Sequence, residues 1–382
     1  MLNRINNKEA LGIIFPNSYD GLVPELVTER LMASIPFASR YRVCDFVLSA
    51  MARAGISNIS MVVRKNYLSL MDHLGSGRQW DLARKKGGLN VIPPFSQKEV
   101  KVYNGRVEAL ESIKGFLCSQ TEKYVVMSDT NMIANMDFAD IIEKHKESGA
   151  DITVVYRKME IPENLQKAPV NKDNLYYTIK FNGNRVEKLY VNMKTEGVVN
   201  FSMNVYVMER DRLINMIEEA YVLGSTSFER DVIAPQIGSL NVYGYCFEGY
   251  TAHIHDMKSY FNENMKLLED DNLNGLFGPG PVWTKIRDDN PTRYIKGAKV
   301  SNIMAADGCV IEGEVENSIL FRGVKIKKGA KVKNCVLMQD TIVEENANLE
   351  YVITDKRVTI TEGKSLSGAD TFQVYVAKKQ IV

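Results

Sequence analysis

The chain has 382 residues, beyond the usual length of a single domain, so two domains are expected. Charged residues make up 25% and hydrophobic residues 45%, and the formal net charge of +1 hides no strongly basic or acidic block, so we expect no nucleic-acid partner. No apolar run approaches the roughly 20 residues that cross a bilayer, and the start lacks the apolar core of a secretory signal, so we expect a cytoplasmic protein without a membrane partner.

The first half of the chain alternates short apolar runs with amphipathic segments. Strands are predicted at residues 10–14, 59–63, 124–127 and 152–156, with helices from 46 to 51 and from 138 to 146 and a loop from 128 to 136. This alternation is typical of a Rossmann-like α/β domain with a mostly parallel sheet, which binds ligands at the carboxyl ends of its strands. Asp129 directly follows a predicted strand and is therefore a candidate site residue.

The character of the chain changes after Asp271, where Gly, Pro and Asn accumulate. We predict an α/β domain over residues 1–270, a linker over 271–294 and a second domain over 295–382. In the second domain, steps of six join Val324, Ala330, Val336 and Ile342, and a parallel series joins Ile326, Val332 and Met338. Hexapeptide repeats of this kind are typical of a left-handed parallel β-helix; a plain β-sandwich is the alternative.

Four ordered motifs resemble those of the ADP-glucose pyrophosphorylases, the glucose-1-phosphate adenylyltransferase family. Residues 40–49 and 54–56 resemble KYRIIDF-LSN and SGI; residues 126–129 resemble LAGD; residues 103–110 resemble YRGTADAV; and residues 202–207 resemble SMGIYVF. The resemblance covers nearly the whole chain. It implies a glycosyltransferase-A-like nucleotidyltransferase domain followed by a left-handed β-helix.

The departures from the family concern its chemistry. Where active members have the glycine-rich loop GGxGTRL, whose N–H groups cradle phosphates, this chain has Phe15, Pro16 and further bulky residues, with only Gly21 left. Met32 stands where the family has a lysine in RAKPAVPF. The family's EKP lysine aligns near residues 191–193, and Lys194 substitutes for it only after a slip of one residue. Tight triphosphate binding in the usual mode is therefore not expected.

The metal site of the family is also altered. Its WRDVGT aspartate and its LAGD aspartate together hold Mg²⁺; here His253 stands for the first, and Asp256 lies out of register. Neutral imidazole is a poor ligand for this hard cation. A soft metal at His253 and His255 lacks a third ligand nearby, and the five scattered cysteines show no zinc spacing, so we predict no metal and no cofactor for this chain.

This pattern resembles the GlgD-type subunits of the family. The resemblance implies a regulatory subunit with absent or very low activity, which modulates ADP-glucose synthesis for glycogen together with a catalytic subunit that holds Mg²⁺. The implied assembly is a hetero-oligomer, expected to be a tetramer, and a homo-oligomer is also open. The alternative is an active adenylyltransferase that makes ADP-glucose and pyrophosphate from ATP and glucose 1-phosphate. A hexapeptide acyltransferase is excluded, because no histidine follows His255.

Seven residues are candidates for a functional role within this family context. Asp129 and Glu108 are vestigial catalytic candidates, each with an alternative structural role as a cap or scaffold carboxylate. The candidates for binding a substrate or an anionic effector are basic: Arg40, Arg42, Arg64, Lys65 and Lys194. Arg40 and Arg42 either fasten their loop or meet a phosphate, and the basic stretch from Arg64 to Lys86 either holds a sugar bisphosphate or is solvated surface.

Overall fold

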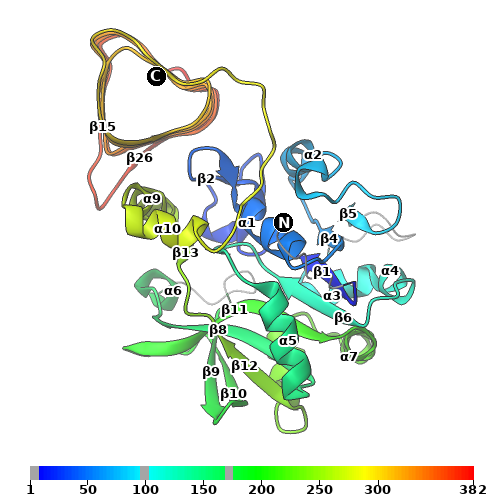
Figure 1. Cartoon of the computed structure of the whole chain (residues 1–382). Helices are drawn as coiled ribbons and strands as arrows, with labels where there is room; N and C mark the ends of the chain where they lie inside the picture. The colour runs from blue at the N-terminus through cyan, green and yellow to red at the C-terminus, as the bar shows by residue number, and fades with distance from the viewer. Residues whose placement is uncertain (1–7, 95–102, 168–174) are drawn as a thin grey trace.

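The computed structural model describes residues 8–94, 103–167 and 175–382, and within them an α/β domain carries a β-helix (Figure 1). In the described part of the chain, nine strands form the main sheet. Their order is β5 (Gly88–Ile92), β4 (Asn58–Val62), β1 (Ala10–Ile14), β6 (Tyr124–Ser128), β11 (Val198–Glu209), β8 (Ile152–Glu160), β12 (Val242–Cys246), β10 (Arg185–Val191) and β9 (Tyr177–Asn182).

The part of the sheet that positions the site is parallel. β5, β4, β1 and β6 run side by side in the same direction, and β8 and β12 form a second parallel pair. β11 runs antiparallel between these two groups. Every residue of β1 is buried, as expected of a central strand covered on both faces. The predicted strands and the α/β class are thus confirmed.

Helices cover both faces of the sheet. On one face pack α1 (Val43–Arg53) and α5 (Phe138–Ser148), with apolar side chains such as Leu48 and Ile141. On the other face pack α3 (Arg106–Ser112), α4 (Lys114–Cys118), α7 (Arg210–Val222), the π-helix η4 (Phe228–Ile233) and α8 (Ala234–Gln236). The shorter peripheral helices are η1 (Asp20–Leu22), η2 (Met32–Ser34), α2 (Leu68–Leu74), η3 (Arg78–Trp80) and α6 (Glu163–Lys167).

The segment from 128 to 136, predicted as a loop, contains a strand. β7 (Met132–Ala134) pairs antiparallel with β13 (Thr251–His253), about 120 residues later in the chain. A three-residue strand whose partner is so distant has no local periodicity, which is why the sequence did not reveal it. A second small ladder joins β2 (Pro36–Phe37) to β3 (Tyr41–Arg42) just before α1.

The second domain is a parallel β-helix, as predicted. One ladder stacks β14 (Arg293–Tyr294), β16 (Val310–Ile311), β18 (Lys325–Ile326), β21 (Ile342–Val343) and β24 (Thr359–Ile360). The other strands are β15 (Lys299–Ala305), β17 (Glu314–Leu320), β19 (Lys331–Lys333), β20 (Val336–Leu337), β22 (Asn348–Glu350), β23 (Val352–Thr354), β25 (Ser365–Ser367) and β26 (Val374–Val376). Figure 1 shows the coils end on as a triangular stack.

The step of six does not hold around the whole coil. Lys331 pairs with Asn348 and Asn348 with Ser365, so these coils have 17 residues, one short of three hexapeptides. Ala330 and Val332 are interior as predicted, and after Val332 the interior positions shift by one, to Cys335 and Leu337. Val336 and Met338, predicted to point inward, belong instead to the apolar cluster shared with the α/β domain, and the interior residue next to the half-buried Ile342 is Val343.

The two domains pack tightly through helices that lie between them in Figure 1: α9 (Met257–Met265), η5 (Lys266–Leu268) and α10 (Asp270–Phe277). An outward row of the β-helix, Ile319, Val336 and Ile353, joins the apolar cluster of these helices. A buried ion pair crosses the same boundary, because Arg30 Nη2 lies 2.6 and 2.8 Å from the two oxygens of Asp355.

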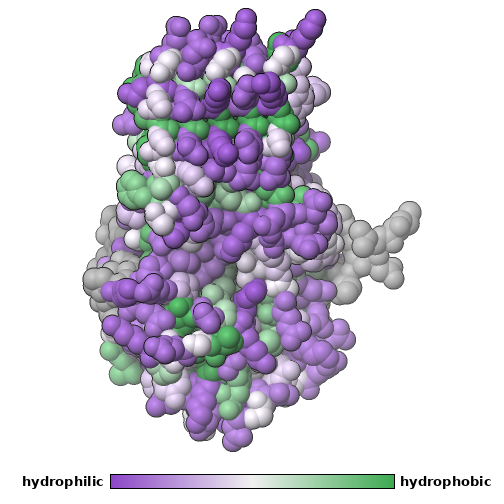
Figure 2. Space-filling model, turned by 90° about the vertical axis from the view of Figure 1, so that its left-hand side faces the viewer, coloured by the Kyte–Doolittle hydropathy of each residue, from purple (hydrophilic) through white to green (hydrophobic). Residues whose placement is uncertain are grey.

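The surface on the side shown in Figure 2 is mostly hydrophilic, crossed by a narrow hydrophobic row on the β-helix. Within the described residues, no helix combines the length and apolar character that a membrane span requires.

Candidate functional site

A cavity of about 230 Å³ opens at the carboxyl ends of β1, β4 and β6, where α/β sheets bind their ligands. We call it the sheet-end cavity. It is lined by Phe15 after β1, Val62 at the end of β4 and Asp129 after β6. The predicted candidates Arg64 and Lys65 line it as well, since they follow β4.

The loop after β1 folds back on itself. The backbone N–H of Phe15 donates to Ser128, that of Ser18 to Phe15, that of Asp20 to Asn17 and that of Leu22 to Tyr19. Tyr19 has the left-handed backbone angle φ of 64°, and its hydroxyl donates to the carbonyl of Leu175 at 2.7 Å and accepts from Asn204 at 2.5 Å. These N–H groups therefore already have backbone acceptors and do not form an anion cradle.

A buried ion network lies in the sheet-end cavity. The guanidinium of Arg106, from the start of α3, donates to Asp129 Oδ1 at 2.6 Å and to Glu229 Oε1, which lies on η4. The Arg106 side chain is 10% exposed, and the Asp129 and Glu229 side chains are 2% and 5% exposed. The guanidinium lies 4.7 Å from the centre of the Phe15 ring, and the Ser18 hydroxyl donates to Asp129 Oδ1 at 2.7 Å.

The charges in this network support one another. Burial lowers the pKa of Arg106, but the negative charges of Asp129 and Glu229 outweigh it, so the net shift of its pKa is upward. Burial raises the pKa of Glu229, which the nearby guanidinium partly offsets. Arg106 is thus a permanent cation held between two carboxyl groups.

The Mg²⁺ ion that the family implies does not fit this arrangement. Asp129 Oδ1 is engaged by the Arg106 guanidinium and the Ser18 hydroxyl, and a cation already occupies the space beside it. The second ligand position is His253, whose ring packs near Phe201 and His255 and whose Nε2 lies 3.4 Å from Asn131 Nδ2. Burial lowers the pKa of His253 well below its usual value, so this imidazole is neutral.

The remaining predicted residues lie apart. Met32 is fully buried, and its backbone N–H donates to Asp20 Oδ1 at 2.7 Å. The carbonyl of Pro16 accepts from the N–H of Ala33. Glu108 Oε2 accepts from the backbone N–H of Asn104, two residues before α3, which is a scaffold role, and Lys194 is exposed outside the described cavities.

The side chains of Arg40 and Arg42 have different surroundings in the structure. Arg40 forms an ion pair of 3.1 Å with Asp307 of the β-helix. Arg42 lines a second cavity of about 290 Å³ between the domains, which we call the interdomain cavity. Its basic residues come from both sides: Arg42, Lys285, Arg287, Arg322, Lys356, Arg357 and Lys378, against the acidic Asp72 and Asp340. This charge excess would attract an anion.

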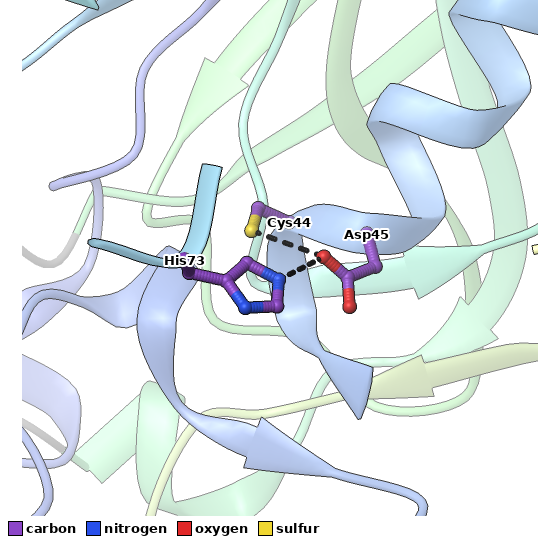
Figure 3. A group of neighbouring side chains, drawn as sticks. All are labelled: Cys44, Asp45 and His73. Carbon is purple, nitrogen blue, oxygen red and sulfur yellow. Dashed lines mark hydrogen bonds and ion pairs between the residues drawn. The ribbon is translucent and has the colours of Figure 1, made fainter. Parts of the chain in front are cut away.

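A buried cluster of Cys44, Asp45 and His73 lies beside Arg42 at the interdomain cavity, and Figure 3 shows these three side chains with the contacts between them. Asp45 accepts the backbone N–H of Arg42 through Oδ2 at 2.9 Å, and its Oδ1 accepts from His73 Nε2 at 2.6 Å and from the thiol of Cys44 at 3.6 Å. Burial lowers the pKa of His73 and raises that of Cys44, so both side chains are neutral donors. Their ligand atoms bond to one another, and we assign the cluster to fastening α1 to α2 rather than to metal binding.

Sequence reasoning missed Arg106 and Glu229. The signal for Arg106 was available, because residues 103–110 resemble YRGTADAV and the arginine stands at the family's threonine. Glu229 lies in a π-helix about 120 residues later and carried no signal of its own.

The comparisons with known proteins agree with this geometry. Residues 26–166 match the nucleotidyl transferase family, and residues 286–374 match the GlmU-like C-terminal hexapeptide family. Fold and cavity thus define a nucleotidyl transferase domain joined to a hexapeptide β-helix.

Comparison with individual proteins shows which relatives within this class the chain is similar to. The glycogen biosynthesis protein GlgD of Bacillus subtilis is 32% identical over 98% of this chain and 97% of its own length, and GlgD of Geobacillus stearothermophilus is 33% identical over 85% and 83%. The glucose-1-phosphate adenylyltransferase of Clostridium perfringens strain 13 is 28% identical over 99% and 95%. The chain belongs to the GlgD family of glycogen biosynthesis proteins, related to the glucose-1-phosphate adenylyltransferases.

Proposed function

We propose that this chain is a regulatory subunit, with little or no turnover of its own, in an assembly that makes ADP-glucose for glycogen synthesis. Its partner is a catalytic glucose-1-phosphate adenylyltransferase subunit, which supplies the Mg²⁺ ion, the ATP site and the chemistry. The proposal includes a cytoplasmic location and a mixed oligomer, expected to be a tetramer.

The conformation of the loop after β1 is the main observation that supports this proposal. Nucleotidyl transfer depends on holding phosphates in position and neutralising their charge. Here the N–H groups of Phe15, Ser18 and Asp20 donate to backbone carbonyls, and the Tyr19 hydroxyl fixes the loop to Leu175 and Asn204. A nucleotide would have to break these bonds before the loop could bind its phosphates.

The interdomain cavity supports a regulatory role. Arg42 of the α/β domain and Lys356 of the β-helix both line this cavity, so an anion bound there would lie between basic groups of the two domains. Binding of such an effector would therefore change the contacts between the two domains, and through them the contacts with neighbouring subunits. We include this cavity in the proposal as the effector site, with a phosphorylated small molecule as its ligand class.

The test is an assay of the purified chain for ADP-glucose formation from ATP and glucose 1-phosphate, with and without a catalytic subunit. We expect turnover by the chain alone to be below about one hundredth of the partner's rate, since a phosphate site and a metal site are both lost. Adding the chain should change the partner's rate or its response to an anionic effector. Rapid synthesis by the isolated chain would overturn the proposal.

Asp129→Asn is the control for trace activity. Turnover that arises in the sheet-end cavity of this chain should fall in the variant, whereas activity from a contaminating enzyme should not change. Co-purification with the catalytic subunit, followed by mass measurement of the complex, tests the mixed oligomer separately.

The second candidate is an active adenylyltransferase with a rearranged phosphate site. The similarity to the glucose-1-phosphate adenylyltransferase of C. perfringens and the position of Asp129 in the cavity favour it. Calorimetric titration with ATP and magnesium separates the two candidates, because only an active enzyme is expected to bind the nucleotide with magnesium dependence.

A further inference from the structure

The carboxylate of Asp129 has an unusual environment. Its Oδ1 accepts two hydrogen bonds, but its Oδ2 is buried and has no hydrogen-bond partner among the described residues. A buried, unpartnered carboxylate oxygen is costly unless a cation neutralises the group. The observation points to a cation as the natural neighbour of this carboxylate.

A second carboxylate faces the same cation. Glu229 bonds to the other terminal nitrogen of the Arg106 guanidinium, so one positive charge holds two carboxyl groups that come from distant parts of the chain. Together with the hydroxyl of Ser18, these carboxyl groups form an all-oxygen set, which is the donor type that hard divalent cations prefer.

We propose that Arg106 is the resident cation of the sheet-end cavity, and that it closes a latent divalent-cation site formed by Asp129, Glu229 and the Ser18 hydroxyl. The guanidinium balances the charge that a metal ion would otherwise balance and fills the space between the two carboxylates. In the native chain the site is therefore closed to metal, and removing the guanidinium opens it.

The neighbouring contacts explain why the guanidinium stays in place. The centres of the Phe15 and Tyr206 rings lie 4.7 and 5.9 Å from the guanidinium carbon, and both rings attract this cation. Arg106 lies on the first turn of α3, whose backbone packs against Thr226 through the N–H of Val107. The side chain is thus directed into the cavity by the helix that carries it.

The experiment compares Mn²⁺ binding by the full-length native chain and by Arg106→Thr, using thermal unfolding and the paramagnetic resonance signal of free Mn²⁺. The native chain should take up no Mn²⁺ at Asp129 and show no shift in Tm. Arg106→Thr should have a lower Tm without metal and gain about 3 °C or more at Mn²⁺ well above its Kd. The double variant R106T/D129N should lose that gain.

Two further variants keep the result interpretable. Arg230→Thr removes another arginine of the same cavity, one that pairs with its neighbour Asp231, and it should behave like the native chain towards Mn²⁺. If R106T does not fold, Arg106→Gln keeps hydrogen-bond donors without the charge and should also bind Mn²⁺. A folded R106T or R106Q that ignores Mn²⁺, or a native chain that binds it through Asp129, would refute the inference.

This inference goes beyond the proposed function and can fail separately from it. Turnover of ATP by the isolated chain would remove the proposed function, whereas absence of Mn²⁺ binding in R106T would remove only the role assigned to Arg106.

Discussion

Asp20 shows how a single buried carboxyl group shapes the altered loop. Its Oδ1 accepts the backbone N–H of Met32 at 2.7 Å, and its Oδ2 accepts the side-chain amide of Asn17 at 2.8 Å. These bonds join the loop after β1 to η2. Burial raises the pKa of Asp20 to about 6, although both hydrogen bonds and the nearby Lys65 act in the opposite direction.

This shift predicts a pH-dependent stability that Asp20→Asn removes. Since the folded state binds the proton more tightly than the unfolded state, the contribution of Asp20 to the free energy of unfolding decreases from about pH 4 to pH 6. Two pKa units correspond to about 3 kcal/mol at most. Denaturant unfolding of both proteins at pH 4.5 and pH 7.5 should show the native chain losing stability relative to the variant. Parallel pH profiles would contradict the assigned pKa.

Individual residues of the site differ in how well the sequence predicts their role. The replacement of glycines by Phe15 and Pro16 was visible because each changes backbone chemistry in a motif of known spacing. The ion network was not visible, because Arg106, Asp129 and Glu229 meet only after three elements have packed. Charged residues that pair across the fold leave no periodic signal.

Single asparagines determine one corner of the β-helix. Asn302, Asn317 and Asn334 all have left-handed backbone angles, with φ of 48°, 44° and 50°. Their side chains form a ladder, since the amide of Asn302 donates to Asn317 at 2.8 Å and that of Asn317 donates to Asn334 at 2.5 Å. Asparagine tolerates this conformation better than other residues with a β-carbon, and here it also links successive coils.

Asn317→Ala and Asn317→Gly separate the two contributions. Both variants lose the ladder, but only alanine is strained in the left-handed conformation, so we expect N317A to be about 1 kcal/mol less stable than N317G. Urea unfolding followed by circular dichroism measures the difference. Equal stability of the two variants would show that the backbone angle at this corner carries no cost.

Elements with strong local patterns were predicted correctly, and those defined by distant partners were not. β1 and β6 are continuous buried apolar runs and were found from sequence, whereas β7 depends on pairing with β13. In the β-helix the step of six identified the fold, but the 17-residue coil shifted the interior from Val336 to Cys335. A period read from a few positions cannot reveal where a coil is one residue short.

Charged side chains lie on both sides of the boundary between the α/β domain and the β-helix. Arg30 Nη2 donates to both oxygens of the buried Asp355 carboxylate, and Asp355 Oδ2 also accepts from the hydroxyl of Tyr375 at 3.0 Å. Lys356 is the next residue along the chain after Asp355. Burial, together with the positive charges of Arg42 and Arg30, lowers the pKa of Lys356 well below its usual value. The basic groups of the interdomain cavity therefore disfavour the charged form of Lys356, and an anion bound there would favour it.

Lys356→Met tests this arrangement with inorganic phosphate as the probe. Phosphate at millimolar concentration should raise the Tm of the native chain, because it binds the folded state and joins cations of both domains. The variant should be at least as stable as the native chain without phosphate, since it no longer holds an amino group among the cations Arg30 and Arg42, and should respond to phosphate less. Lys364→Met, at an exposed position of the β-helix, is the matched control and should keep the native response. An equal phosphate shift in K356M and in the native chain would exclude Lys356 from anion binding and leave its depressed pKa without a functional role.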